Sequence, residues 1–308
     1  MTGMEKITTG ISLQPNAYMK IITLFSLYAV ALLLSQSAAA TFSKHKTLSA
    51  HCREMKLKPA PVNNISTIWL PAGYQRPVSL AGSFAAWLGM LMLKADNRVF
   101  LYNKQLKQDQ ASHYAVIDIS TGDEDLQQCA DAIMRLRSEY FWTAKNYAQV
   151  KFPASGNVIL SFDRYAKGER YDVHNNKLYV CRRANTSPNY THSNLMNFLR
   201  IVFTYCGTYT VRQQTNPVAD LKDIQAGDVL VKAGSPGHAM IVADVAVNKE
   251  TGRKIFLLAQ GYMPAQDMHI VKNKNNAALS PWYSVEDIKD KIVTPGYVFD
   301  KTDLRRWK

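Results

Sequence analysis

The chain has 308 residues, and 47% of them are apolar, which is enough for a substantial buried core in one large domain or two small ones. Its formal net charge is +13, and such a charge favours anionic polymers or surfaces as partners. The basic residues are spread along the chain and form neither a basic helix nor a stripe interleaved with aromatic residues, so the pattern argues against nucleic-acid binding.

The N-terminus has the pattern of a secretory signal peptide. Lys20 precedes an apolar run over residues 21–34, and the small residues 38–40 follow as a cleavage site. A run of about 14 apolar residues is too short to span a bilayer comfortably, and no longer run follows. We therefore predict a signal peptide over residues 1–40, with Met19 as an alternative start. The mature protein is expected to be exported, periplasmic or associated with the cell envelope, and without a stable transmembrane segment.

Four cysteines are present, and no two of them have the CxxC spacing of zinc ribbons or thioredoxin-like sites. In an oxidising compartment one or two disulfides could form, and the sequence leaves their pairing open. We expect no metal and no cofactor. The cysteines are Cys52, Cys129, Cys181 and Cys206.

After a polar and proline-containing linker over residues 41–64, residues 65–308 read as one α+β domain, with two halves that could meet near residue 185. Ser83 is a plausible N-cap for a short helix that ends near Lys94. Short apolar runs predict strands at residues 99–102, 113–119, 158–162 and 178–181.

The clearest helical pattern covers residues 124–142, where apolar residues recur on one stripe. This prediction places Cys129 more than one turn inside the helix, and it makes Arg135 and Glu139 a surface ion pair. A second helix is predicted over residues 193–206. A short helix capped by Ser284 is predicted over residues 285–291.

Residues 227–273 predict an antiparallel meander. Three apolar strands at 229–231, 238–247 and 254–260 are separated by turn residues. His238 starts the second strand and Gln260 ends the third, so the two side chains could meet. A catalytic imidazole needs such an arrangement, in which an amide or carboxylate holds one ring nitrogen while the other nitrogen faces the reaction.

This order of a Gly-Asp turn at Gly227 and Asp228, a strand, His238, a second strand and Gln260 resembles the C-terminal half of papain-like cell-wall amidases and peptidases of the NlpC/P60 and CHAP type. The resemblance implies that His238 is the general base and that Gln260 orients it. The predicted fold class is therefore α+β, an antiparallel meander packed with two main amphipathic helices, with a papain-like C-terminal half as the implied architecture.

A broader resemblance covers nearly the whole mature chain. It rests on three groups of residues, and these resemble the exported proteins, found mainly in Bacteroides and relatives, that are grouped as domain of unknown function 4846. The resemblance implies an exported envelope protein and no specific activity. The three groups are Ser83-Phe84 with Trp87-Leu88; Asp125 to Ala132 with Arg135-Leu136-Arg137 and Glu139-Tyr140; and Leu258-Ala259-Gln260 with Tyr262 to Asp267 and Ser280 to Tyr283.

The candidate nucleophiles each have a simpler structural interpretation. Cys129 and Cys206 fall on apolar helical stripes, where cysteine is usually a small hydrophobic residue, and Cys206 would lie at a helix C-terminus, where the dipole raises the pKa of a thiol. The helix predicted to begin at Ser193 occupies the place of the NlpC/P60 nucleophile helix but starts without a cysteine, and a serine there is usually an N-cap. Cys129 remains the best candidate.

Four further residues are candidate binding residues. Asp228 is expected to hydrogen-bond its own turn. Asp267 would share a strand face with His269, and these two with His238 would make only a weak metal site. Trp282 and Tyr283 follow a Ser-Pro turn that could present an aromatic ring to a sugar or peptide, although the core is their usual place.

Two functions remain open from the sequence. In the first, the protein is a non-catalytic or weakly catalytic relative of papain-like enzymes that binds peptidoglycan or another envelope polymer. In the second, it is an active cell-wall peptidase or amidase that uses Cys129, His238 and Gln260. The absence of a cysteine at a predicted helix start favours the first, and the His-Gln pair favours the second.

Overall fold

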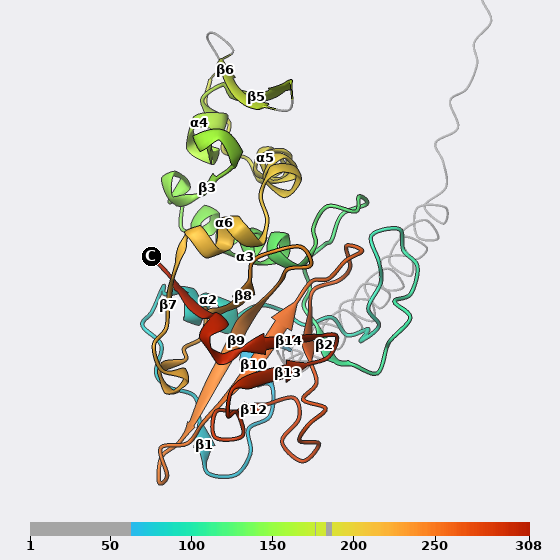
Figure 1. The fold of residues 1–308 in the computed structure, drawn as a ribbon, viewed down its shortest axis with the longest axis vertical. Coiled ribbons are helices and arrows are strands. Elements are labelled where there is room, and N and C mark those ends of the chain that lie inside the picture. Colours follow the sequence, from blue (N-terminus) through green and yellow to red (C-terminus); the bar gives the residue numbers. More distant parts are fainter. Residues whose placement is uncertain (1–62, 176, 183–186) are drawn as a thin grey trace, which may run out of the picture. The chain divides into compact units, whose positions relative to one another are not determined.

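A nine-stranded antiparallel sheet organises the residues that the structure describes (Figure 1). These are residues 63–308 of a computed structural model, without residues 176 and 183–186, so the predicted signal peptide and Cys52 lie outside them. Along its main path the strand order is β2-β11-β10-β9-β8-β15-β7, while β1 pairs with β9 and β12 with β10. The strands are β1 Tyr74–Gln75, β2 His113–Val116, β7 Thr215–Pro217, β8 Val229–Lys232, β9 His238–Asn248, β10 Lys254–Gln260, β11 His269–Val271, β12 Tyr283–Ser284 and β15 Leu304–Trp307.

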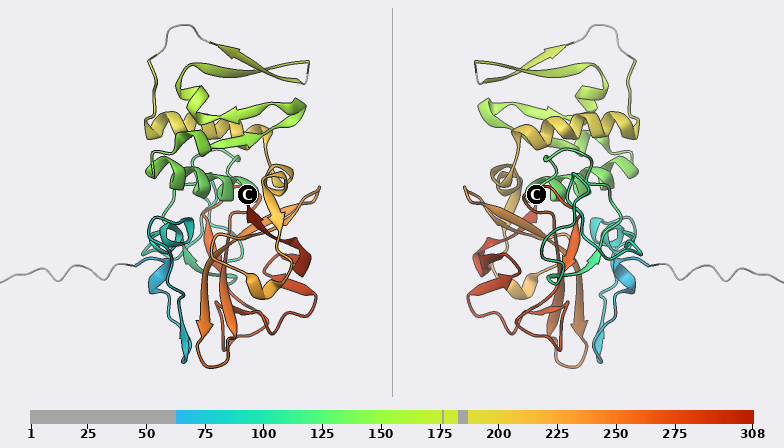
Figure 2. Two further views of the ribbon diagram at one scale, coloured as in Figure 1. Left: turned by 90° about the vertical axis from the view of Figure 1, so that its left-hand side faces the viewer. Right: turned by 90° about the vertical axis from the view of Figure 1, so that its right-hand side faces the viewer.

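Helices cover one side of this sheet. The views in Figure 2 show α5 stacked over α3, and α3 next to the sheet and α2. Smaller antiparallel ribbons complete the described part of the chain. The helices are α2 Phe84–Gly89, α3 Cys129–Thr143, α4 Phe162–Ala166, α5 His192–Tyr205 and α6 Thr208–Gln213, and the ribbons pair β3 Lys151–Pro153 with β4 Ile159–Ser161, β5 Glu169–His174 with β6 Lys177–Arg182, and β13 Lys291–Thr294 with β14 Tyr297–Asp300.

The central strands are apolar on both faces because both faces are covered. Along β10, Ile255 and Leu257 belong to the core under the helices, whereas Phe256 and Leu258 belong to a second core on the opposite face, where Phe299 of β14 also lies. Successive strand residues point to opposite faces, so continuous apolar runs are what a sheet covered on both faces requires. The meander predicted from these runs is confirmed as β8, β9 and β10.

Helix α3 begins five residues later than the sequence predicts. Gln128 is its N-cap in an extended conformation, and the backbone N–H of Gln128 donates to the Asp131 carboxylate at 3.1 Å. Asp125 does not join a helical turn, because its carboxylate accepts the backbone N–H of Ala265 at 2.6 Å. The acidic stretch that imitates a first helical turn is therefore a loop, and Cys129 is the first residue of the helix.

Other local predictions had mixed outcomes. Ser83 caps α2 as predicted, by accepting the Ala86 N–H, but α2 ends at Gly89. The helix predicted over 193–206 is confirmed as α5, with Thr191 as the N-cap. The helix predicted over 285–291 is wrong, because this segment makes single turns, such as Ile288 N–H to Val285 O at 3.2 Å, between β12 and β13.

The antiparallel sheet and the amphipathic helices of the predicted α+β class are thus confirmed, with two further corrections. The run at residues 99–102 makes isolated bridges instead of a strand. Arg135 and Glu139 do pair, at 2.6 Å, but the pair is buried because α5 covers this side of α3.

Candidate functional site

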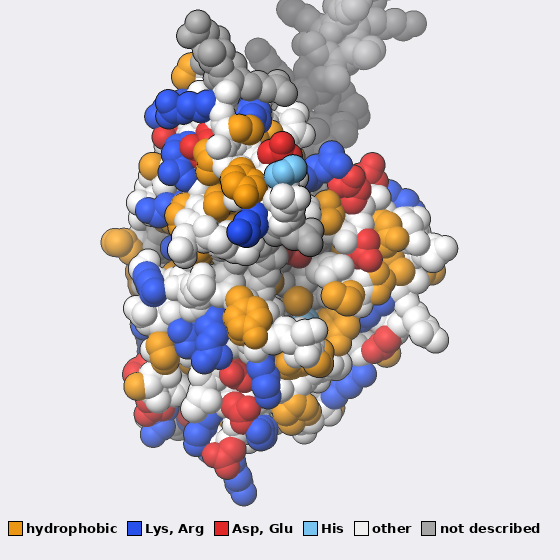
Figure 3. Space-filling model, turned by 45° about the horizontal axis from the view of Figure 1, so that its top comes forward, with side chains coloured by type: hydrophobic (Ala, Val, Ile, Leu, Met, Phe, Trp, Pro, Cys, Tyr) orange, Lys and Arg blue, Asp and Glu red, His pale blue; other side chains and the backbone are white. Residues whose placement is uncertain are grey.

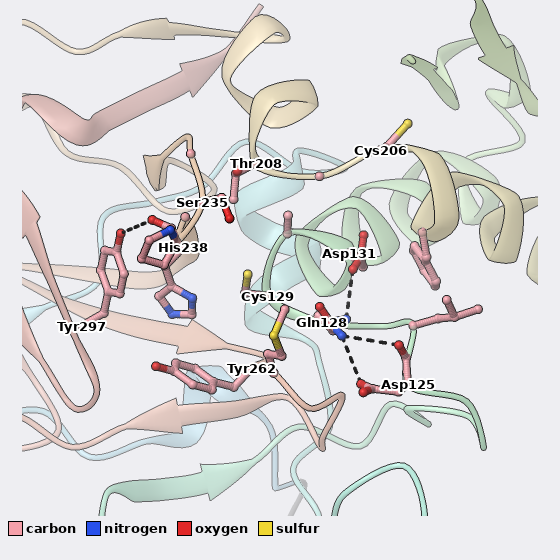
Figure 4. A pocket seen from close by; sticks show the side chains of 18 residues that line it. Asp125, Gln128, Cys129, Asp131, Cys206, Thr208, Ser235, His238, Tyr262 and Tyr297 are labelled. Atoms are coloured by element: carbon pink, nitrogen blue, oxygen red, sulfur yellow. Dashed lines mark hydrogen bonds between the residues drawn. The ribbon is translucent and has the colours of Figure 1, made fainter. Parts of the chain in front are cut away.

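A pocket of about 640 Å³ opens where the first turn of α3 faces the start of β9 (Figure 4). Its walls come from five separate parts of the chain: the start of α3, the junction of α5 and α6, the loop between β8 and β9, the loop after β10, and β14. The residues that line it are Asp125, Leu126, Gln128, Cys129, Ala130, Asp131, Phe203, Cys206, Gly207, Thr208, Gly234, Ser235, Pro236, Gly237, His238, Tyr262, Met263 and Tyr297.

The pocket brings Cys129 and His238 together from positions more than a hundred residues apart. In Figure 4 their side chains point toward one another, from α3 on one wall and from β9 on the other. The backbone N–H of Ala239, the residue that follows His238, lies near enough to the Cys129 thiol to lower its pKa. The thiol therefore lies against the start of the strand that carries the imidazole.

Gln260 fixes the orientation of the His238 ring. The amide oxygen of Gln260 lies 2.7 Å from Nε2 of His238, and both side chains are almost completely buried. Because an amide oxygen only accepts hydrogen bonds, Nε2 carries the proton and Nδ1 keeps its lone pair. The rings of Tyr262 and Tyr297, each with its centroid 4.9 Å from that of His238, enclose the imidazole. The pairing of His238 with Gln260 that the sequence suggested is present.

The thiol and the imidazole both favour their neutral forms in this closed pocket. Burial raises the pKa of the Cys129 thiol, and hydrogen bonds from the backbone N–H groups of Ala239 and Ala130 partly offset the rise. Burial also lowers the pKa of His238, and the hydrogen bond to Gln260 partly offsets that change. The resting pair is therefore a thiol beside a neutral imidazole, which can accept a proton.

The start of α3 also supplies positive electrostatic potential. The first turn of a helix leaves backbone N–H groups without intrahelical partners, and the helix dipole places partial positive charge at this end. Cys129 is the first helical residue. An anion that forms on a group bound next to the sulfur would meet the N–H of Cys129, which is the arrangement of an oxyanion hole.

The other candidate nucleophiles are not placed for reaction with His238. Cys206 lines the far side of the same pocket, at the C-terminal end of α5, and burial raises the pKa of its thiol to about 12. Ser193 is exposed in the first turn of α5 and does not line the pocket. The helix that presents its N-terminus to His238 is α3 rather than the helix that begins near Ser193, so that expectation is corrected.

The four candidate binding residues lie outside the pocket. Asp228 is buried and pairs with Arg306 at 2.7 Å, and it accepts the N–H of Gln225 in its own turn, as expected. Asp267 pairs with Lys94 at 2.9 Å. Trp282 is fully buried in the core, and Tyr283 donates its hydroxyl to the carbonyl of Lys272, so neither ring is presented to a ligand from the Ser-Pro turn.

Among the residues that the structure describes, no group of three or more His, Cys, Asp or Glu residues is placed so that it could hold a metal ion. Cys129, Cys181 and Cys206 form no disulfide with one another there.

Two residues, one in the pocket wall and one behind Gln260, have roles that the sequence did not suggest. Asp131 is a buried residue of the first turn of α3, and burial raises the pKa of its carboxyl to about 8. His269 of β11 contacts the amide of Gln260 from the side opposite His238, at 3.4 Å. Strand pairing between β10 and β11 places Gln260 opposite His269, and this pairing could be found only once the meander was extended by a fourth strand.

The outer surface shows no concentration of positive charge on the face in Figure 3, where Lys and Arg side chains alternate with acidic and apolar ones. The residues that line the pocket include Asp125 and Asp131 and, among those that the structure describes, no Lys or Arg. The net positive charge of the chain thus does not extend into the pocket.

None of the helices between residues 63 and 308 is both long and apolar enough to cross a membrane. Comparison with curated proteins and with solved structures found no match. A family model does match residues 65–306, which is most of the chain. The resemblance that the sequence motifs indicated is therefore confirmed at the level of the family, and the chain belongs to the family described as domain of unknown function 4846.

Proposed function

We propose that the protein is a cysteine-dependent hydrolase that cleaves an amide bond through a thioester intermediate. Cys129 is the nucleophile, His238 the general base and acid, and Gln260 the residue that orients His238. The observation that carries this proposal is that the first residue of α3 is a cysteine whose side chain faces a histidine held by a buried amide. This is the combination of nucleophile, base and orienting group that cysteine hydrolases use.

The reaction follows from these positions. Nδ1 of His238 takes the thiol proton as the Cys129 sulfur attacks the carbonyl carbon, and the oxyanion that forms is stabilised by N–H groups at the start of α3. The imidazolium then gives its proton to the leaving nitrogen, the C–N bond breaks and an acyl thioester remains. A water molecule, deprotonated by His238, attacks the thioester, which releases a carboxylic acid and restores the thiol.

Peptide amides of peptidoglycan are the first substrates to test, because the predicted export would place the protein in the cell envelope. We also propose that the architecture of the site is papain-like, as the sequence resemblance implies. The C-terminal meander supplies the histidine and its amide partner, as the resemblance implied. The nucleophile helix, however, ends more than eighty residues before the meander and is separated from it by α4, α5 and α6.

A non-catalytic pocket that binds an envelope ligand is the second candidate function. The specific observation in its favour is the neutral state of the resting pair, because burial raises the pKa of Cys129 and lowers that of His238. An enzyme with such a pair must transfer the thiol proton within the bound complex, whereas a binding site needs no such step.

Chemical modification of the cysteines separates the two functions without a known substrate. The protein is treated with iodoacetamide and the rate at each cysteine is followed by peptide mass spectrometry. We expect Cys129 to react at least ~10 times faster than Cys206, because His238 assists only Cys129, and we expect His238→Ala to remove this advantage. Equal rates at Cys129 and Cys206 in the wild-type protein would contradict the assignment of the nucleophile.

Activity is tested on purified peptidoglycan, with mass spectrometry of the released fragments. The wild-type protein should produce new fragments, and Cys129→Ala and His238→Ala should lower their rate of formation by roughly a thousandfold or more, as expected when a member of such a group is removed. Cys181→Ala is the control and should keep full activity, because Cys181 is an exposed free cysteine that does not line the pocket. If no fragments form but the protein co-sediments with the sacculi, the binding function replaces the hydrolase.

A further inference from the structure

A row of buried polar side chains continues from the candidate site into the sheet. His238, Gln260 and His269 lie on three neighbouring strands, β9, β10 and β11, and His113 follows on β2. Gln260 is directly opposite His269 in the antiparallel pairing, so their side chains lie on the same face. Each of the four side chains is at most 3% exposed, so each hydrogen bond between them is made without competition from solvent.

The proton positions in this row follow from one fixed acceptor. Nδ1 of His269 lies 2.8 Å from the backbone carbonyl of Asp267, which can only accept. Burial lowers the pKa of His269 to about 3, so the ring is neutral and carries a single N–H. That N–H must be at Nδ1, and Nε2 must therefore be an acceptor.

The rest of the row is then determined. An acceptor at Nε2 of His269, 3.4 Å from Gln260, requires the NH₂ group of the amide to face it. The amide oxygen is then turned toward His238, 2.7 Å from its Nε2. In the reversed orientation the oxygen of Gln260 would face the lone pair of His269 and its NH₂ group would face His238, and the tautomer of His238 would be inverted.

We infer that His269 is a positioning residue that fixes the amide orientation of Gln260 and, through it, keeps the lone pair of His238 on Nδ1, facing Cys129. This inference rests on the proposed function for its importance to catalysis, but the hydrogen-bond relay itself can be measured without any activity. His269 touches neither the thiol nor the space for a substrate, since it does not line the pocket. It acts on the site through Gln260.

His113 provides a matched control. Its ring contacts the ring of His269 edge-on, with a centroid distance of 5.8 Å, and it is equally buried. Its Nε2 donates a hydrogen bond to the backbone carbonyl of Asn97, and it makes no hydrogen bond to Gln260. Replacing His113 thus removes a buried imidazole from the same part of the sheet without breaking the relay.

The direct test is nuclear magnetic resonance of the wild-type protein labelled with ¹⁵N-histidine, in which two-bond proton–nitrogen correlations identify the tautomer of each ring. We expect His269 to be protonated on Nδ1 and His238 on Nε2. A His269 ring protonated on Nε2 would overturn the inference whether or not any variant folds.

Two variants then test the effect on Cys129. His269→Leu removes the acceptor, whereas His269→Gln can return an amide oxygen close to the position of Nε2. We expect His269→Leu to give a mixture of His238 tautomers and to slow alkylation of Cys129 by iodoacetamide by roughly tenfold to a hundredfold, a size typical for loss of a partner that orients a functional histidine. His269→Gln should restore most of the rate, and His113→Leu should leave both the tautomer and the rate unchanged.

The possible failures can be told apart. If His113→Leu slows alkylation as much as His269→Leu, or if His238 keeps its Nε2 proton in His269→Leu, then His269 has only a structural role and the inference is wrong. If the tautomers are as expected but wild-type Cys129 reacts no faster than Cys206, the relay stands and the proposed hydrolase fails.

Discussion

A shift of about one helical turn in the start of α3 changes the chemistry that is expected of Cys129. A cysteine inside a helix, on its apolar stripe, is a small hydrophobic residue, whereas the same cysteine at the first position of the helix faces the dipole and the free N–H groups. The sequence predicted that Cys129 lies inside the helix, because residues 124–128 look like an acidic first turn. The structure uses Asp125 instead to hold the backbone of Ala265, a contact between segments 140 residues apart that no local pattern reveals.

Asp131 is expected to make the folded protein less stable as the pH rises. Burial raises the pKa of its carboxyl from 3.8 to about 8, so the folded state holds a proton that the unfolded state has lost. Its contribution to stability is therefore complete below about pH 4 and is lost as the pH rises through about 8. We expect Asp131→Asn, which keeps an oxygen for the N–H of Gln128, to gain stability over the wild type by up to about 1.4 kcal/mol per pH unit in this range.

Urea unfolding at pH 5 and pH 9 measures this difference. Asp123→Asn is the control, because Asp123 is exposed in the loop before α3 and its replacement should change stability equally at both pH values. If Asp131→Asn and the wild type differ by the same amount at pH 5 and pH 9, Asp131 is ionised throughout and the argument from burial is wrong.

At the scale of single elements, the sequence succeeded where local and tertiary requirements agree. The strands β8, β9 and β10 were predicted within one or two residues because both faces of the sheet demand apolar residues and polar turns separate them. It failed at residues 285–291, where Ser284 resembles an N-cap but its hydroxyl donates to Glu286 and the strands β12 and β13 on either side leave room only for turns. His238 and Gln260 were found because they lie at the open end of one hairpin, at the start of β9 and at the end of β10. His269 was not assigned to the relay, since its pairing with Gln260 depends on β11.

Gly261 allows α3 to approach the end of β10. A Cβ atom at this position would lie 2.9 Å from the carbonyl oxygen of Gln128 and 3.1 Å from the Cβ of Ala132. That carbonyl cannot move freely, because it accepts the first helical hydrogen bond of α3, from the N–H of Ala132. We expect Gly261→Ala to push the start of α3 away from β9, to cost about 1–3 kcal/mol of stability and to slow alkylation of Cys129.

Thermal unfolding and the iodoacetamide rate measure both effects. Gly89→Ala is the matched control, because a Cβ there meets only the Cβ of Ser66 at an ordinary 3.7 Å. A Gly261→Ala protein with wild-type stability and wild-type reactivity at Cys129 would show that the close approach of helix and strand is not needed to form the site.

At the scale of the whole described unit, the sheet is completed by the last strand of the chain. β15 is inserted between β8 and β7, and its Arg306 reaches back to Asp228 in the turn before β8. The contact is bidentate, with the two oxygens of Asp228 at 2.7 and 2.8 Å from the guanidinium group. The strand that carries His238 pairs with one edge of β8, and β15 pairs with the other edge, so β15 covers the hairpin edge next to the site.

Removal of Arg306 should therefore weaken the whole unit more than the loss of an ordinary surface ion pair. Asp228 is 2% exposed. When both members of an ion pair are buried, removal of one member lowers the free energy of unfolding by several kcal/mol, because the other charge stays buried without a partner. Since the side chain of Arg306 is 38% exposed, water screens the pair and we expect Arg306→Met to cost about 1–3 kcal/mol. The double variant Asp228→Asn/Arg306→Met should recover part of this loss, because it leaves no unpaired charge.

Lys291→Met, which removes the exposed partner of Asp300, should have no measurable effect on unfolding by urea. If Arg306→Met is as stable as Lys291→Met, β15 is held by its strand pairing and apolar contacts alone. The bidentate pair would then have no part in closing the sheet.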